Sequence, residues 1–548
     1  MEIKELLTNA IEGTVACDDK TRTAYSEDTS IFHIKPSCVV YPKHTEDIKA
    51  LVRLANKHPG EFSLTARAAG TDMSGGPLSD SVVVSFVEHF NKIKTVNDGF
   101  AVTEPGVFYR DFEEATLEKN LLLPCYTASR ELNTVGGMVA NNSAGEKSLT
   151  YGKTERYVKA LRVVLSDGNE YEFRKLTRDE LEVKKSLDTF EGKIYRELEQ
   201  LVVENDKVLQ EAKPPVSKNS AGYALWDVWD KEADTFDLTK LFVGSQGTLG
   251  LMTEITFDLV PPTKHARMLV IFLRRKHMPL LGSLVNDVLS HNPESFESYD
   301  DHTFTVMLKV LPKLMKRLGR NPFSLFRDFV PEIKMVLTGG IPKLILMAEF
   351  TGNDEAEVIH KTESTLLAIQ SKYSVSLHST RTQAERDKFW AIRRESFKLL
   401  REQVHGKHTA PFIDDISVNP KFLPEFLPKL YDIMDEYRLT YTIAGHIGDG
   451  NFHIIPLMDF ERPDFVEVIE ELSKRVYDLV IKFDGSITGE HNDGIIRTPF
   501  LEQMYGKEVM TLFQNTKDIL DPRRIFNPHK KVDPDFKLLR AAVKTKFL

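Results

Sequence analysis

Cysteine is scarce in this chain of 548 residues, which has only Cys17, Cys38 and Cys125. No two of them have the C-x-x-C spacing of a metal or redox motif, and three thiols cannot bind a four-cysteine iron–sulfur cluster. We therefore expect neither a disulfide framework nor an iron–sulfur cluster held by this chain alone. The pattern is typical of a reducing compartment, so a cytoplasmic location is expected.

Long apolar runs are also missing. No uncharged apolar stretch reaches 18 residues, the length that a membrane-spanning helix needs, so no span is expected. The first residues, MEIKELLTNAIEG, carry charges inside their apolar stretch, unlike a signal peptide. The formal net charge is −9, which argues against broad binding of nucleic acid.

What the chain does have is the composition of a globular protein, with 41% apolar and 28% charged residues. Its length exceeds one ordinary core, so at least two domains are expected. Paired prolines at 261–262 indicate a boundary. We predict four segments: an N-terminal extension at 1–34, a first domain at 35–262, a second at 263–499, and a C-terminal helix and tail at 500–548 that return to the first domain.

Short strands and helices alternate in the first domain. Apolar residues at helical spacing predict helices at 44–56 and 109–119. Runs rich in β-branched residues predict strands at 62–67, 82–86 and 101–106. Asp167-Gly168 predicts the turn of a hairpin within 161–173. The pattern favours an α+β or α/β domain with many glycine turns.

In the second domain, the order of the predicted strands and helices differs from that of the first and suggests an antiparallel sheet covered by helices on one face. Strands are predicted at 268–273, 344–350, 414–418, 439–446 and 452–457. Helices are predicted at 278–290, 354–371, 421–437 and 463–483, and a last helix at 500–518.

Residues 303–343 differ from both domains because they mix apolar residues with Lys309, Lys313, Lys316 and Arg317. One interpretation is a solvated helix packed on the second domain. The other is a basic amphipathic surface that contacts a membrane at its periphery, or a partner. Pro312 argues against one continuous helix.

Four loops of the first domain are rich in glycine and other small residues: TARAAGTDMSGG (65–76), TEPG (103–106), TVGGMVANNSAGEKSLTYG (134–152) and LFVGSQGTLGLMTE (241–254). Small residues let backbone N–H groups approach an anion closely. None of the loops is G-x-G-x-x-G or a P-loop. A tight turn explains any one of them, but a large ligand with a pyrophosphate explains the set.

Two histidines, His446 and His453, flank the turn of AGHIGDGNFHI (444–454). A hairpin there would bring both imidazoles together, and Glu490 in TGEHNDGIIRTP offers an oxygen ligand beside His491. Two imidazoles and one carboxylate form the three-ligand pattern of a catalytic Zn²⁺, Mn²⁺ or Fe²⁺ site. The alternative is that each histidine is a satisfied polar residue.

Two arginines on a predicted helix, Arg393 and Arg394 in FWAIRRESF, could bind a carboxylate substrate, because the guanidinium fork matches a carboxylate. The alternative is that they are ordinary solvent-exposed residues of that helix. Lys407 is a second candidate cation.

These motifs together resemble the FAD-linked 2-hydroxy-acid dehydrogenase and oxidase family, which includes D-lactate dehydrogenases, glycolate oxidase and D-2-hydroxyglutarate dehydrogenase. Its motifs P-R-G-G-G-T-S, T-I-G-G-N-x-A-T-N-A-G-G and G-S-E-G-T-L-G-I-I-T-E correspond to ARAAGTD, TVGGMVANNSAG and GSQGTLGLMTE. Its G-H-x-G-D-G-N-x-H is complete here, and its G-E-H-G-x-G corresponds to GEHNDG. The departures are Ala68, Ala69, Gln246, Asn492 and Asp493. GEHNDGIIRTP is most similar to the branch whose larger members are fused to an iron–sulfur domain.

The resemblance implies an α+β fold: a two-part FAD-binding domain of the vanillyl-alcohol oxidase (PCMH) type, and a substrate or cap domain that carries the metal site. It also implies that FAD is bound by residues of the glycine-rich loops and of the C-terminal tail. By position they are Arg67, Ala68, Ala69, Gly70, Thr71, Pro105, Gly106, Thr134, Gly136, Gly137, Asn141, Asn142, Ala144, Gly145, Gly244, Gly247, Thr248, Gly250, Glu254 and Asn527.

The same resemblance assigns catalytic roles. His446, His453 and Glu490 would bind the divalent metal, with zinc favoured over manganese and iron. His491 would be the base, and Arg393, in the family's W-x-x-R after Trp390, would bind the substrate carboxylate together with Lys407.

The implied reaction is the oxidation of a D-2-hydroxy acid, of the D-lactate or D-2-hydroxyglutarate type, to the 2-oxo acid, with hydride passing to flavin N5. The electrons would then leave to a separate carrier: an iron–sulfur subunit, a quinone or an electron-transfer flavoprotein. The alternatives are an oxidase of the same fold that uses O₂, and a non-catalytic flavin-binding subunit of an iron–sulfur complex. A zinc hydrolase built on the histidine pair would leave the glycine-rich loops unexplained.

Overall fold

The computed structural model describes residues 3–301, 340–401 and 408–544, and the side chains of 395–401 are not among the described parts. Its internal contacts divide the chain into two compact units. Unit 1 comprises Met1–Gly145, Tyr151–Pro262 and Ser486–Leu548, and unit 2 comprises Glu146–Thr150 and Thr263–Gly485. The sequence predicts that the second domain continues to residue 499, whereas here the chain rejoins unit 1 at Ser486.

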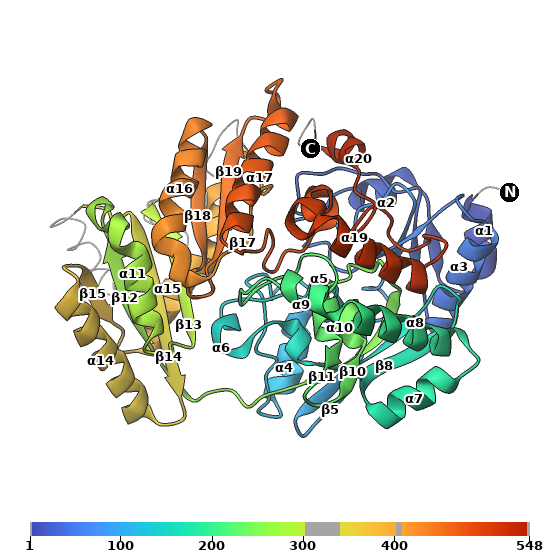
Figure 1. Cartoon of the computed structure of the whole chain (residues 1–548), viewed down its shortest axis with the longest axis horizontal. Coiled ribbons are helices and arrows are strands. Elements are labelled where there is room, and N and C mark those ends of the chain that lie inside the picture. Colours follow the sequence, from blue (N-terminus) through green and yellow to red (C-terminus); the bar gives the residue numbers. More distant parts are fainter. Residues whose placement is uncertain (1–2, 302–339, 402–407, 545–548) are drawn as a thin grey trace. The chain divides into compact units, whose positions relative to one another are not determined.

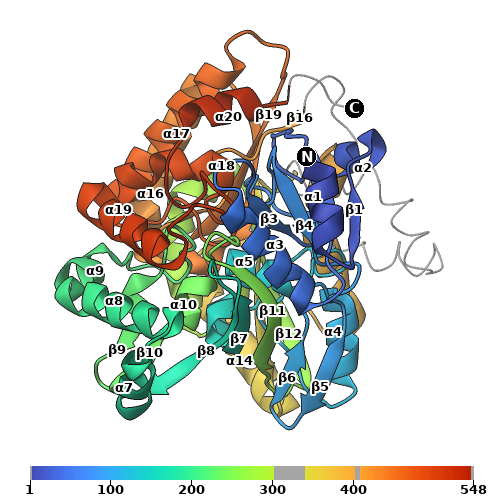
Figure 2. The same cartoon turned by 90° about the vertical axis from the view of Figure 1, so that its right-hand side faces the viewer.

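A small sheet near the N-terminus of unit 1 has the strand order β1 (Thr14–Ala16), β2 (Cys38–Tyr41), β4 (Val82–Ser85), β3 (Leu64–Arg67). The last three strands are parallel, and they are almost wholly apolar and buried, as parallel strands covered on both faces must be. Helices α1 (Ile3–Ala10) and α3 (Thr45–Lys57) lie side by side against this sheet (Figure 2). The segment 1–34, predicted as an extension, thus contributes one strand and two helices to the unit.

The larger sheet of unit 1 is antiparallel, and its inner strand β11 (Leu251–Asp258) alternates buried and half-buried residues, which is the pattern of a sheet with one face on the core. The predicted hairpin is present as β7 (Val158–Val164) and β8 (Glu170–Thr177). The strand order is β5 (Ile93–Asn97), β6 (Phe100–Thr103), β11, β7, β8, β10 (Thr235–Asp237), β9 (Trp229–Asp230).

The other helices of unit 1 pack around these two sheets (Figure 2). They are α2 (Asp19–Ala24), α4 (Tyr109–Leu117), α5 (Val135–Asn141), α7 (Arg178–Ser186), α8 (Phe190–Glu204), α9 (Asp206–Ala212), α10 (Thr239–Phe242), α18 (Gly494–Arg497), α19 (Leu501–Leu520) and α20 (Phe536–Ala542). The short α6 (Ser148–Tyr151) lies at the junction of the two units' ranges.

Unit 2 is built on one antiparallel sheet, shown in Figure 1. Its strand order is β15 (Ser376–Ser379), β12 (His265–Leu273), β14 (Leu344–Gly352), β13 (Ser295–Asp300), β18 (Thr440–His446), β19 (Asn451–Met458), β16 (His408–Thr409), and β17 (Ile416–Ser417) also pairs with β19. The antiparallel sheet predicted for the second domain is therefore present, and the sequence pattern did not predict its strands β13, β15 and β16.

Helices cover both faces of this sheet, not one face as predicted. Four of them, α11 (Leu281–Leu289), α14 (Glu355–Lys372), α16 (Leu423–Glu436) and α17 (Phe465–Lys482), form one layer (Figure 1). On the other face, α15 (Gln383–Arg401) places Phe389, Trp390 and Ile392 in a core cluster with alternate residues of β12, namely Met268, Val270 and Phe272. The intervening residues of β12 are buried too, because the helical layer lies on their side.

Cys17 and Cys38 form a disulfide, which corrects the expectation that the cysteines stay unpaired. The reason lies in strand register: Ala16 of β1 is opposite Val39 of β2, so the next pair along the ladder is Cys17 and Cys38. Spacing in the sequence does not reveal this neighbourhood. Cys125 is free and buried.

The part of the chain that the structure describes contains no helix long and apolar enough to cross a membrane. Residues 303–339 of the predicted basic surface lie outside the described residues.

Asp47 ties the N-terminal segment to α3, because its buried carboxylate accepts hydrogen bonds from three backbone amides, those of Glu12, Gly13 and Lys43. We expect Asp47→Ala to lower the free energy of unfolding of the full-length protein by about 2 kcal/mol, since it leaves these donors without their acceptor. Urea titration followed by circular dichroism measures the change. The exposed Asp98 is the matched control, and Asp98→Ala should change stability by less than about 0.5 kcal/mol; equal effects of the two variants would contradict the role of Asp47.

Candidate functional site

The glycine-rich loops of unit 1 converge on the buried side chain of Gln246. Its Nε2 donates to Ser74 Oγ at 3.1 Å and to Asn141 Oδ1 at 3.3 Å, and its Oε1 accepts from the Gly494 amide at 2.8 Å. One amide group therefore joins the loop after β3, the end of α5 and the segment after His491.

Asn527 joins the same loops from the C-terminal tail. Its Nδ2 donates to the carbonyl groups of Gly76 (2.9 Å) and Gln246 (2.8 Å), and its Oδ1 accepts from Thr65 Oγ1 at 3.2 Å. The side chain is fully buried. Asn527 was predicted to bind a cofactor, and in the structure it holds two of the predicted cofactor loops together.

The loop after β3 presents backbone donors to its surroundings. The amides of Ala68, Ala69, Gly70 and Thr71 have no hydrogen-bond acceptor among residues 3–301, 340–401 and 408–544, and these residues are partly exposed. Gly70 adopts φ +70°. Successive unsatisfied amides around a positive-φ residue form a concave anion site, so this loop fits a pyrophosphate.

The start of α5 offers no such donors. The amides of Val135 and Gly136 donate to backbone carbonyls, that of Pro105 in the case of Gly136 (2.9 Å), and the Gly137 amide donates to Thr134 Oγ1 at 3.2 Å. A Cβ on Gly137 would lie 3.8 Å from the Ala68 Cβ, so the helix start lies beside the donor loop without adding amides to it.

Several other predicted cofactor glycines are required by packing. A Cβ added to Gly106 or Gly145 would lie within about 2 Å of a backbone oxygen, at 2.2 Å from Phe86 and 1.9 Å from Tyr126 respectively. A Cβ on Gly250 would lie 2.6 Å from the Val163 side chain of β7, and Ala144 is buried. Gly244 and Gly247 have φ of +81° and +69°, values that favour glycine.

Two predicted residues on the last loop point elsewhere. Glu254 forms ion pairs with Lys94 (2.6 Å) and Arg162 (3.4 Å) on the more exposed face of the large sheet. Thr248 is buried and hydrogen-bonds the Tyr223 hydroxyl at 2.7 Å. The structure therefore does not bring Glu254 to the loop that carries the amide donors.

Arg67 and Asn142 are also bound within the protein. The Arg67 guanidinium donates to the carbonyl groups of Tyr25 (3.1 Å) and Glu27 (2.6 Å). Asn142 Oδ1 accepts from the Glu155 amide at 3.1 Å. Both side chains thus hold the loops in place through hydrogen bonds to the backbone of neighbouring segments.

A pair of acidic residues, the half-buried Asp28 and the buried Asp72, lies beside the donor loop, and sequence reasoning missed it. The Asp72 carboxylate accepts from the amides of Ser74 (2.7 Å) and Gly76 (3.0 Å). The Thr29 amide donates to the Asp72 carbonyl at 2.9 Å, which places Asp28 next to Asp72. Desolvation, reinforced by the charge of Asp72, raises the pKa of Asp28 to about 7. Its buried Oδ2 has no partner within the described ranges.

Glu490 and His491 lie in unit 1 on a segment held by buried lysines. Lys218, fully buried, binds Glu490 Oε2 at 3.0 Å, and Lys153 donates to the Gly489 carbonyl at 2.8 Å. Glu490 Oε1 is 3.8 Å from His491 Nε2. The segment that carries the predicted base is therefore fixed by charge-assisted contacts.

The two departures that follow His491 have structural partners. Asn492 donates through Nδ2 to the carbonyl groups of Gly244 (2.8 Å) and Asn141 (3.1 Å). Asp493 forms a fully buried ion pair with Lys531 at 2.8 Å. Both side chains connect the segment to the rest of unit 1.

In unit 2, a tight connection joins β18 to β19 and brings His446 and His453 together, with ring centroids 5.3 Å apart. Each Nδ1 contacts a buried carboxylate: Glu297 Oε1 lies 2.5 Å from His446, and Asp414 Oδ1 lies 3.1 Å from His453. A carboxylate at Nδ1 fixes the tautomer and ring orientation of a metal-binding histidine. Nε2 is then the ring atom that would bind a metal.

Glu297 reaches His446 because their strands are neighbours. Ser298 of β13 pairs with Gly445 of β18, so Glu297 stands opposite His446. The other oxygen of Glu297 binds Arg393 Nε at 3.2 Å, and Arg393 is only 4% exposed. The predicted substrate-binding arginine and one predicted metal ligand thus share a carboxylate.

Three further residues of unit 2 bear on the site. Arg394 pairs with Glu146. Asp415, which sequence reasoning did not single out, has φ +76° and offers a carboxylate oxygen within 4.8 Å of a ring nitrogen of His453. Lys407 lies outside the described residues.

Glu297 had no signal in the sequence, because a charged residue in an otherwise unassigned stretch does not reveal its partners. Asp414-Asp415 had a weak signal in the sequence, since two adjacent acidic residues precede a strand. Of the three predicted metal ligands, the structure brings His446 and His453 together in unit 2, and Glu490 belongs to unit 1.

The raised pKa of Asp28 predicts a dependence of stability on pH. The folded-state pKa of about 7 exceeds the unfolded value near 4, so the folded protein binds the extra proton, and stability is lost as pH rises through 7. Asp28→Asn removes this penalty while keeping an oxygen for Ser30. We expect the free energy of unfolding of the variant, measured by urea titration, to exceed that of the parent at pH 8 by about 4 kcal/mol, and the difference to vanish near pH 4.

Asp98→Asn, at an exposed site, controls for the loss of one charge. A difference between Asp28→Asn and the parent that is the same at pH 4 and pH 8 would contradict the assignment.

Two protein families match this chain. Residues 36–174 match the FAD binding domain, and residues 281–531 match the C-terminal domain of FAD linked oxidases. The first range includes the amide-donor loop, and the second includes Arg393, the histidine pair, Glu490 and His491.

Named relatives match over nearly all of the chain at modest identity. A D-2-hydroxyglutarate dehydrogenase of Escherichia coli is 26% identical over 97% of this chain and 52% of its own length. The GlcD subunit of glycolate oxidase of Bacillus subtilis is 26% identical over 97% of each chain. A D-lactate dehydrogenase of Archaeoglobus fulgidus is 26% identical over 90% of this chain and 91% of its own. The chain thus spans about half the length of the first of these relatives.

Solved structures share the fold. The 4-ethylphenol oxidase of Gulosibacter chungangensis superposes with a TM-score of 0.67 at 16% identity, covering 97% of both chains. p-Cresol methylhydroxylase superposes with a TM-score of 0.66 at 15% identity, covering 97% of this chain and 96% of its own. The predicted α+β fold with a flavin domain of the vanillyl-alcohol oxidase type is confirmed. The two family matches identify an FAD binding domain at residues 36–174 and a C-terminal domain of FAD linked oxidases at residues 281–531.

Proposed function

We propose that this chain oxidises a D-2-hydroxy acid, of the D-lactate or D-2-hydroxyglutarate type, to the 2-oxo acid, using FAD and a divalent metal. The observation that carries the proposal is the pairing of each histidine of the GHIGDGNFH motif with a buried carboxylate through Nδ1. A subunit that only binds flavin has no use for two oriented imidazoles. The relatives named as D-2-hydroxyglutarate and D-lactate dehydrogenases support the substrate class.

FAD fits unit 1. The amides of 68–71 would bind its pyrophosphate, and the loops joined by Gln246 and Asn527 would enclose it. Bound FAD would supply the acceptor for the two electrons and the α-hydrogen of the substrate.

A divalent metal fits the donor set of His446, His453 and Glu490, with zinc as the first expectation because nitrogen and oxygen donors with an open position suit it. Bound metal would supply positive charge that lowers the pKa of the substrate hydroxyl. The Lys218 ammonium binds Oε2 of Glu490 at 3.0 Å, and Glu490 would bind the metal through its carboxylate.

The chain's own residues would bind substrate and move one proton. Arg393 would hold the substrate carboxylate with its guanidinium, whose Nε already binds Glu297. Lys407 is the second proposed contact to that carboxylate. His491 would accept the hydroxyl proton on its imidazole, which is 21% exposed. Such a base contributes on the order of 10²- to 10⁴-fold in rate.

The electrons would leave to a separate carrier, either an iron–sulfur subunit, a quinone or an electron-transfer flavoprotein. This chain cannot bind a cluster through cysteine, since Cys17 and Cys38 are joined and Cys125 is buried. The match to the GlcD subunit over nearly its full length supports a multi-subunit acceptor.

Anaerobic flavin bleaching tests the proposal. The FAD-loaded protein is mixed with D-lactate, D-2-hydroxyglutarate or glycolate, and with the L isomers, and absorbance near 450 nm is followed. We expect one D acid to reduce the flavin at least about 100-fold faster than its L isomer, and His491→Asn to slow that reduction about 100-fold while retaining FAD. Flavin that no 2-hydroxy acid reduces would refute the proposal, and peroxide formed with O₂ as sole acceptor would show an oxidase.

Metal affinity tests the role of Glu297. We expect Glu297→Gln to weaken zinc binding by about 10- to 100-fold, because the amide no longer orients His446 as the carboxylate does. Equilibrium dialysis against a chelator, followed by metal analysis, measures it without any assay of activity.

Glu349 provides the matched control for this experiment. It is another buried glutamate of the same sheet, but it binds Trp390 Nε1 and Arg386 instead of a histidine. Glu349→Gln should leave zinc affinity within about twofold of the parent. If both variants bind zinc as the parent does, the histidine pair is not a metal site positioned by Glu297.

A further inference from the structure

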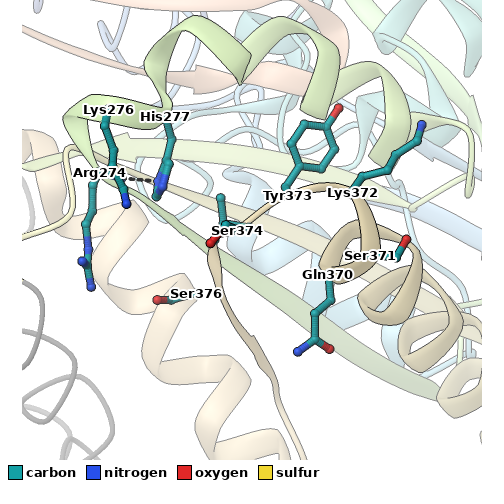
Figure 3. Close-up of a pocket in the computed structure, with 10 residues that line it drawn as sticks. Arg274, Lys276, His277, Gln370, Ser371, Lys372, Tyr373, Ser374 and Ser376 are labelled. Atoms are coloured by element: carbon teal, nitrogen blue, oxygen red, sulfur yellow. Dashed lines mark hydrogen bonds between the residues drawn. The ribbon is translucent and has the colours of Figure 1, made fainter.

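Unit 2 contains a pocket of about 600 Å³ that the proposed function does not use. Figure 3 shows it between Arg274 and the following turn η3 (Arg275–Leu280) on one side, and the end of α14 with the start of β15 on the other. Its lining is polar and basic and includes Arg274, Lys276, His277, Gln370, Ser374 and Ser376. No aspartate or glutamate lines it.

His277 presents a buried donor at this pocket. The ring is 8% exposed, and its Nδ1 accepts a hydrogen bond from the Arg274 amide at 3.1 Å. Burial, with the charges of Lys276 and Arg274, lowers the pKa of His277, so the ring is neutral at pH 7. Because Nδ1 is the acceptor, the proton is on Nε2. That buried N–H has no acceptor in the described part of the chain.

Two cations at the pocket also have no acidic partner among the described side chains, those of Arg274 and Lys276. The third cation of the lining behaves differently. Lys372 pairs with Asp287 at 2.9 Å, and the Tyr373 hydroxyl donates to the same carboxylate at 2.6 Å. Figure 3 shows Lys372 and Tyr373 directed away from Arg274 and His277.

The opposite wall supplies neutral donors. The side chains of Gln370, Ser374 and Ser376 line the pocket, and none of the three donates to another described residue. Two cations, one imidazole N–H, two hydroxyls and one amide exceed what the two oxygens of a carboxylate can accept. A phosphate group, with three terminal oxygens, accepts more of these donors at once, and arginine's fork matches its geometry.

We propose that this pocket binds the phosphate group of a small phosphorylated metabolite, at a site that shares no residue with the proposed flavin and metal sites. The volume exceeds what one phosphate ion fills, which leaves room for the organic part of a phosphate monoester. Ligand pockets of this size usually bind molecules of several heavy atoms.

Calorimetry on the full-length, FAD-loaded protein tests the proposal, with glycerol 3-phosphate as the probe and succinate as a dianion without phosphate, at constant ionic strength. We expect glycerol 3-phosphate to bind at least tenfold more tightly than succinate. Arg274→Gln and Lys276→Gln should each weaken it about tenfold. Arg275→Gln is the matched control, because Arg275 is exposed on the same turn and does not line the pocket; its affinity should equal the parent's.

A second measurement does not depend on variants. In protein labelled with ¹⁵N-histidine, glycerol 3-phosphate should shift the Nε2–H resonance of His277, and succinate at the same concentration should not. Failure of glycerol 3-phosphate to bind, equal binding of succinate, or equal affinities of Arg274→Gln and Arg275→Gln would each overturn the proposal.

Discussion

The carboxylate of Glu297 binds two side chains of the proposed catalytic site at once, His446 through Oε1 and Arg393 through Oε2. All three groups are almost fully buried, so each charge must be compensated locally. Removing one partner from such a buried set typically costs several kcal/mol, because the others lose their compensation. The orientation of the imidazole and the position of the guanidinium therefore both depend on where β13 places this glutamate, and β13 is set by its pairing with β14 and β18.

In unit 1, buried charged side chains likewise fix the segment that carries Glu490 and His491. Lys153, Lys218 and Lys531 are buried, and they bind Gly489, Glu490 and Asp493 respectively. Residues with catalytic roles work best when the surrounding contacts allow them one conformation. Three ammonium groups along five residues provide that constraint, and Gln246 and Asn527 extend it to the loops beside the amide donors.

Local patterns predicted most elements of this fold, because helical and alternating periodicities act within a few residues. The helix predicted at 44–56 is observed at Thr45–Lys57, and the hairpin predicted within 161–173 is β7–β8. The motif histidines were predicted for the same reason, since a short turn joins them. Glu297 was not, because it lies 149 residues from His446 in the chain and meets it only through strand pairing. The Cys17–Cys38 disulfide was missed likewise, since it follows from the register of β1 and β2.

Two residues that differ from the motifs quoted for the family, Asp72 and Gln246, contact each other. The motif P-R-G-G-G-T-S has serine where this chain has Asp72, and G-S-E-G has glutamate where it has Gln246. In the structure the two side chains meet: Gln246 Nε2 lies 3.4 Å from Asp72 Oδ2 and also donates to Ser74, which itself hydrogen-bonds Asp72. A glutamate at 246 would place a second carboxylate against a buried one, at a high electrostatic cost. An amide instead donates to Asp72 and still accepts from the Gly494 amide. With an amide at position 246, the contact between the two loops contains one carboxyl group instead of two.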